Sequence, residues 1–150
     1  MRDLYELQNQ LFEQEIEIIL DKVKNSPNEH IKINVGKVSN RLISEGKLNG
    51  FDFSDYIHNL DVSGLRHALK HHGKNNEKIN TQIPIDDNDL KQIPRILYDY
   101  DSVTFGTKDS KGTDIVKYKK QLLNCEIIYL EEIRTGKKTL TIKSMYKKSC

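Results

Sequence analysis

Apolar residues recur along this chain with two different periods, and the change falls near residue 100. In the first part, residues 3–24 have the spacing of an amphipathic helix, and residues 30–38 alternate as a strand does. Ser39 is expected to cap a short helix that Gly46 ends. This part of the chain therefore predicts helices separated by short extended segments.

A further helix of about ten residues should begin at Asp86 or Asp87, and Pro94 should shorten or kink it. Helices followed by consecutive strands predict an α+β fold, with helices packed on an antiparallel sheet of about four strands and with an N-terminal helix. Alternating residues and turn-like breaks predict those strands at 102–107, 114–119, 124–132 and 137–146.

At 150 residues the chain is long enough for one domain with a substantial core. We expect residues 1–50 to form an N-terminal helical and extended segment, and residues 51–150 to form the main domain. The N-terminal residues carry acids throughout, which excludes a signal peptide, and no apolar run approaches transmembrane length. Two isolated cysteines need no oxidising compartment. We therefore expect a cytoplasmic protein with no membrane partner.

The formal charge of +2 conceals a segregation of charge along the chain. Residues 62–80 hold four bases and one acid, and residues 102–150 hold eleven bases and five acids. Residues 1–24, by contrast, hold six acids and three bases. The distribution fits a protein whose basic parts meet a polyanion, or one whose lysines are simply solvated.

The most distinctive stretch carries His67, His71 and His72, three of the five histidines. Ser63 can cap a helix there and Gly73 can end it, and the basic residues between them have no acidic neighbour. Imidazole titrates near neutrality, so paired histidines beside lysines suit proton transfer next to a phosphate. The alternative is a surface helix with a solvated basic face.

A metal site is a second alternative, because His67 and His71 lie one helical turn apart. No glutamate lies within the pair, and neither Cys125 nor Cys150 has a spacing that would complete a zinc site. We therefore expect no metal and no cofactor.

The last predicted strand changes character along its length. Strict alternation would put one row on a core face, and that row begins apolar and ends in two hydroxyls: Leu140, Ile142, Ser144 and Tyr146. The other face would carry Thr139, Thr141, Lys143 and Met145. A core face that becomes polar is typical of the rim of a site, although a strand end that is merely wet would look the same.

Seven segments in order resemble the phage- and mobile-element-associated nuclease domains of the barnase, EndoU, colicin and RelE-like class, from Phe51 to Lys148: FDFSDYIHNLD, LRHALKHHG, QIPIDDNDLKQIPRIL, DSVTFG, DIVKY, EIIYLEE and LTIKSMYKK. The pattern H-x-L-K-x-H-G of that class falls on residues 67–73. Its closing hydroxyl, methionine and tyrosine fall on residues 144–146, with Ser144 where threonine is usual.

The resemblance implies a nuclease domain at 51–150 with helices on a curved antiparallel sheet, and metal-independent cleavage of RNA in conflicts among phages, mobile elements and hosts. Such cleavage needs a base for the ribose 2′-OH, an acid for the leaving 5′ oxygen and positive charge at the phosphate. The resemblance assigns the acid and base to His67 and His72, whereas helical periodicity pairs His67 with His71. Lys70 would stabilise charge, and Ser144 and Tyr146 would position the phosphate.

Five further residues are expected to bind the substrate: His71, Lys74, Tyr118, Lys143 and Lys147. Tyr118 would stack on a base, although a tyrosine in a strand is more often part of a core. The expected partners are RNA, either tRNA or mRNA, and an immunity or antitoxin protein. The competing hypothesis is a catalytically inactive binding or assembly module of a phage or mobile-element protein, which contacts its partner through residues 3–24.

Overall fold

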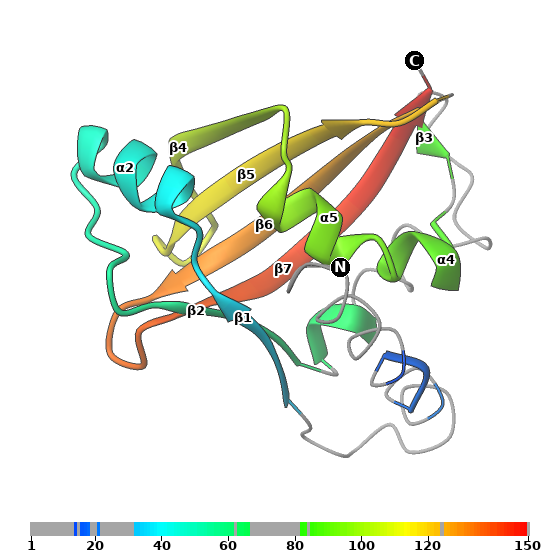
Figure 1. The fold of residues 1–150 in the computed structure, drawn as a ribbon, viewed down its shortest axis with the longest axis horizontal. Helices are drawn as coiled ribbons and strands as arrows, with labels where there is room; N and C mark the ends of the chain where they lie inside the picture. Colours follow the sequence, from blue (N-terminus) through cyan, green and yellow to red (C-terminus); the bar gives the residue numbers. More distant parts are fainter. Residues whose placement is uncertain are drawn as a thin grey trace, which may run out of the picture.

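The structure is a computed structural model, and it describes residues 14, 16–18, 21, 32–61, 63–66, 82, 83, 85–123 and 125–149. These residues form one sheet of seven strands in the order β1-β2-β7-β6-β5-β4, with β3 paired to β7 outside that path (Figure 1). The predicted α+β class is confirmed. The sheet is larger than the four strands that we expected.

The C-terminal third is a run of antiparallel strands, as the alternating pattern predicted. The strands are β4 (Ser102–Lys108), β5 (Asp114–Gln121), β6 (Cys125–Arg134) and β7 (Thr139–Ser149). Tight turns join successive strands, so each strand pairs with its neighbour in sequence.

Three short strands extend this sheet, and they account for the difference from the prediction: β1 (Lys32–Lys37), β2 (Ile57–Asp61) and β3 (Gln82–Ile83). β2 runs parallel to β7, and β1 pairs antiparallel with β2. The partner of β2 thus lies some eighty residues away in sequence, with Ile57 opposite Thr139. A local pattern carries no information about such a pairing.

Three helices have described bounds: α2 (Asn40–Leu48), α4 (Asp87–Leu90) and α5 (Ile93–Tyr98). The side chain of Ser39 caps α2 by accepting from the N–H of Leu42, as predicted. The single helix expected from Asp86 or Asp87 is divided into α4 and α5. Pro94 lies in the first turn of α5, where its missing N–H costs no hydrogen bond.

The helices pack on one face of the sheet, which we call the helix face. Tyr118, Tyr129 and Met145 lie opposite one another on β5, β6 and β7 and point to this face. They are buried in one cluster with Ile96 and Leu97 of α5, which Figure 1 shows in front of the sheet. No described helix is long and apolar enough to cross a membrane.

The described residues of the predicted N-terminal helix, which are 14, 16–18 and 21, are helical. Ile16 is buried in the main core, and Glu17 forms an ion pair of 3.0 Å with Lys91. This part of the N-terminal segment therefore packs on the domain.

Candidate active site

A cavity of about 270 Å³ opens on the side of the sheet away from α5, where β2, β6 and β7 meet the β4–β5 turn. Six of its lining residues are polar or charged: Asp61, Ser63, Lys111, Glu132, Arg134 and Lys143. Gly64 and Ile142 complete the lining. We call this cavity the charged pocket.

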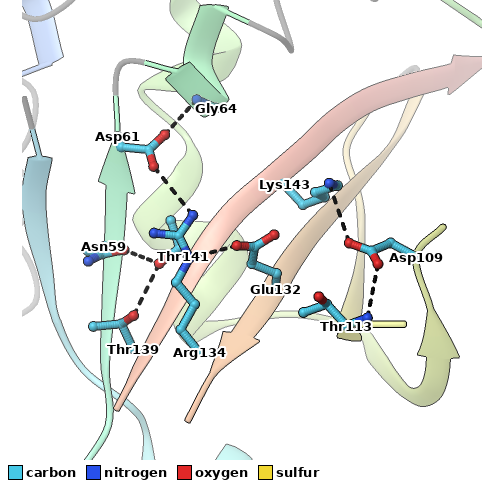
Figure 2. Close-up of polar contacts among 10 residues, drawn as sticks. All are labelled: Asn59, Asp61, Gly64, Asp109, Thr113, Glu132, Arg134, Thr139, Thr141 and Lys143. Atoms are coloured by element: carbon cyan, nitrogen blue, oxygen red, sulfur yellow. Dashed lines mark hydrogen bonds and ion pairs between the residues drawn. The ribbon is translucent and has the colours of Figure 1, made fainter. Parts of the chain in front are cut away.

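Arg134 lies between two carboxylates in the charged pocket (Figure 2). Its Nε donates to Oε1 of Glu132 at 2.6 Å, and its Nη2 lies 3.7 Å from Oδ2 of Asp61. Alternation along β6 puts Glu132 and Arg134 on the same face of the strand, which explains how they meet. All three side chains are largely buried but still reach solvent, with exposed fractions of 16–31%.

The pocket wall next to β2 is the start of a short helix at residues 63–66. Oδ1 of Asp61 accepts from the N–H of Gly64 at 2.6 Å and so satisfies a free donor of the first turn. A Cβ at Gly64 would lie 2.6 Å from Cγ2 of Ile142 and 2.8 Å from its carbonyl oxygen. Only glycine allows this helix start to approach β7 so closely.

The histidine stretch, residues 67–74, follows this helix start directly in the chain and lies outside the described residues. The predicted roles of His67, Lys70, His71, His72 and Lys74 therefore stay predictions.

The opposite wall of the pocket is the β4–β5 turn. Asp109 accepts from the N–H groups of Lys111 at 2.9 Å and Thr113 at 3.0 Å, and the ammonium of Lys143 lies 3.5 Å from its Oδ2 (Figure 2). Hydrogen bonds from the backbone, together with Lys143, hold the pKa of Asp109 below its usual value. The predicted substrate-binding residue Lys143 thus lies at the pocket, where it ties the turn to β7.

The face assignment predicted for β7 is wrong beyond Ile142, because β7 contains a bulge. Glu131 pairs with Ile142, but the next pair along β6 is Leu130 with Ser144, which leaves Lys143 as the extra residue. Ser144 and Tyr146 therefore lie on the face away from the helices. Thr139 and Thr141 share that face of β7 with them.

At the start of β7, polar side chains on this face form a buried chain of hydrogen bonds. Oγ1 of Thr139 lies 3.3 Å from Oγ1 of Thr141, which in turn donates to Oδ1 of Asn59. Ser144 is 8% exposed and Tyr146 is about half-buried. Burial, and then the negative charge of Glu126, raises the pKa of the Tyr146 phenol, so it stays protonated at neutral pH.

Two predicted substrate-binding residues lie elsewhere. Tyr118 is fully buried on the helix face, where its hydroxyl donates to Oε1 of Glu131 at 2.6 Å, so the ring cannot stack on a base. That prediction is wrong, because alternation along β5 turns Tyr118 toward α5. Lys147 also points toward the helices and pairs with Oδ2 of Asp89 at 2.8 Å, which commits its charge to α4.

Sequence reasoning missed Asp61, Glu132 and Arg134. The signal for two of them was the E-x-R spacing in a predicted strand, since such residues share a face. Asp61 gave no such signal, because its proximity to Arg134 depends on the β2–β7 pairing. Among the described residues, no group of three or more His, Cys, Asp or Glu side chains could hold a metal ion.

His58 is a further polar residue that the sequence did not single out. It lies on the helix face with no exposed surface, and its Nδ1 lies 2.8 Å from Oε2 of Glu131. Glu131 therefore accepts from both His58 and Tyr118 inside the core, which is a structural role.

Comparison with known proteins agrees with the resemblance seen in the sequence. No curated protein and no solved structure matches the chain. One family model matches residues 33–150, and its description is phage-Barnase-EndoU-ColicinE5/D-RelE like nuclease3. The match covers most of the chain, including all of the described strands from β2 to β7. The chain belongs to this family of phage-associated nucleases.

Proposed function

We propose that this protein is a toxin-type endoribonuclease that cleaves RNA without a metal ion, by attack of the ribose 2′-OH on the neighbouring phosphate. The observation that carries the proposal is the match of residues 33–150 to a nuclease family. RNA is the substrate that fits, because its 2′-OH supplies the nucleophile and the protein need only move protons and stabilise charge. Cytoplasmic tRNA or mRNA would be the target.

His67 and His72 would act as the base for the 2′-OH and the acid for the leaving 5′ oxygen, with Lys70 stabilising the charge that develops on the phosphate. Ser144 and Tyr146 would position that phosphate. Their shared face on β7 supports this role, since a hydroxyl group can donate to an anion.

The charged pocket supports the same proposal. It borders the helix start from which the chain enters residues 67–74, and its lining brings three positive charges (Lys111, Arg134 and Lys143) against the two carboxylates of Asp61 and Glu132. Arg134 is already oriented by Glu132, so its planar guanidinium is preorganised for an oxyanion. We expect the pocket to hold the phosphate at or next to the cleaved bond.

The test is cleavage of labelled RNA in the presence of EDTA. The wild-type protein should release products that end in a 2′,3′-cyclic phosphate, and His67→Ala should lower the rate by about 10²- to 10⁴-fold. His30→Ala, which changes a histidine outside the 67–72 stretch, serves as the matched control and should retain activity.

Loss of cleavage on chelation would contradict the metal-free mechanism. Full activity of His67→Ala would contradict the histidine assignment. RNA left intact by the wild-type protein at high concentration would favour the inactive binding module instead. Toxicity on expression that disappears with His67→Ala would extend the result to cells, where a neutralising immunity or antitoxin protein is the expected partner.

A further inference from the structure

Two rows of side chains cross the sheet on the face away from α5. The register of β4, β5, β6 and β7 aligns Thr104, Lys117, Leu130 and Ser144 in one row, and Ser102, Lys119, Ile128 and Tyr146 in the next. Each row holds one lysine, two hydroxyl groups and no carboxylate. The first row adjoins the charged pocket, because Glu132 follows Leu130 by two residues on β6.

Lys117 and Lys119, the two lysines of these rows, differ from Lys120 on the same strand in their ion pairs. Lys120 points to the helix face and pairs with Asp99 at 3.1 Å and Asp101 at 3.7 Å. Lys117 and Lys119 are half-buried, and neither pairs with an acidic side chain in the part of the chain that the structure describes. Their charge is therefore available to an anion outside the protein.

The two acids of β6 on this face lie on either side of the pair of rows. Glu126 lies one row beyond Lys119, opposite Lys148 and Gln121. Glu132 lies on the other side, inside the charged pocket. Ile128 and Ser144 of these rows are buried, so the accessible charge between the two acids is that of Lys117 and Lys119 on β5.

We propose that Lys117 and Lys119 bind successive backbone phosphates of single-stranded RNA, on a track that leads away from the charged pocket. The proposal rests on the proposed function. Two residues apart on one strand face, the lysines stand about 6.6 Å from each other, so they form a line along one strand of nucleic acid.

Binding and cleavage can be separated with a short fluorescein-labelled oligouridylate whose riboses are 2′-O-methylated, because this probe lacks the nucleophile and is not cut. The variant is the double substitution Lys117→Gln and Lys119→Gln. The matched control is Lys37→Gln with Lys47→Gln, which removes the same charge from exposed positions on β1 and α2. Fluorescence anisotropy gives Kd between about 50 and 200 mM salt.

Each lysine–phosphate contact to a single strand contributes about 0.7 to the slope of log K against log salt. Losing two contacts should lower the slope by about 1.4, so that over this fourfold salt range the wild-type Kd weakens by about 7-fold more than that of the variant. The control should keep the wild-type slope.

Equal slopes for the wild type and the Lys117/Lys119 variant, or no binding of the probe by the wild type, would overturn the proposal. Equal slopes would indicate that the charge of Lys117 and Lys119 serves an acidic protein partner instead. A reduced slope would support the track even if the wild type failed to cleave unmodified RNA, so the failure of the proposed function is distinguishable from the failure of the track.

Discussion

Replacing Tyr118 and Tyr129 by phenylalanine should have opposite effects on stability, although the two residues are closely matched. They face each other across β5 and β6, their ring centroids lie 6.0 Å apart, and both are fully buried. The hydroxyl of Tyr118 donates to Glu131 at 2.6 Å. The hydroxyl of Tyr129 is buried and has no hydrogen-bond partner among the residues that the structure describes.

The magnitudes follow from the state of each hydroxyl. Tyr118→Phe removes a hydrogen bond to a buried carboxylate, which should cost about 1.5–3 kcal/mol of the free energy of unfolding. Glu131 would keep its contact with Nδ1 of His58 at 2.8 Å, so the loss should not exceed that range. Tyr129→Phe removes a polar group whose burial already costs about 1–3 kcal/mol, so this variant should be as stable as the wild type or more stable.

Urea unfolding followed by far-UV circular dichroism measures both effects. We expect unchanged m-values and a difference between the two variants of about 2–4 kcal/mol, which is large against a typical total stability of about 5–15 kcal/mol. Equal losses in the two variants would refute the reasoning, because they would show that the cost comes from the altered ring environment and not from the hydrogen bond to Glu131.

Two further predictions concern pH and packing. Burial raises the pKa of Tyr118 and of Tyr129, so above about pH 10 the unfolded chain binds fewer protons than the folded one and stability falls by about 1.4 kcal/mol per pH unit for each tyrosine. In Tyr118→Phe, the free energy of unfolding measured with urea should therefore fall less steeply above about pH 10, by about 1.4 kcal/mol per pH unit. An identical pH dependence in the variant and the wild type would contradict this. Gly64→Ala should cost about 1–3 kcal/mol in thermal unfolding, since the new Cβ would lie 2.6 Å from Ile142. Gly136→Ala, where a Cβ meets no atom within 4 Å, is the control, and equal melting temperatures would contradict the close approach.

The elements that the sequence predicted well are those held by local interactions. The four C-terminal strands alternate over most of their length and are joined by short turns, so each finds its partner nearby in sequence. The cap at Ser39 likewise depends on a neighbour three residues away. In these cases the pattern of a short stretch contains nearly all of the physical information that decides its structure.

The features that the sequence did not predict depend on contacts between distant segments. β2 pairs with β7, and this pairing alone brings Asp61 to Arg134. Tyr118 was assigned to the substrate although its side chain faces the helices, because the period of β5 fixes which residues share a face but not which face is covered. That choice is made by α5, whose contact with β5 no local pattern contains.

The bulge at Lys143 explains how one strand serves both the core and the candidate site. Before it, Leu140 and Ile142 point to the helix face, and after it Met145 does so, which keeps the apolar row intact around the extra residue. Under strict alternation, Ser144 and Tyr146 would instead face α5 and bury their hydroxyls there. Met145 would then be exposed on the other face. The hydroxyls of Ser144 and Tyr146 can therefore join the opposite face without a loss of core packing. A bulge conserves the core while it re-aims the side chains beyond it, which is why bulges are frequent next to functional sites.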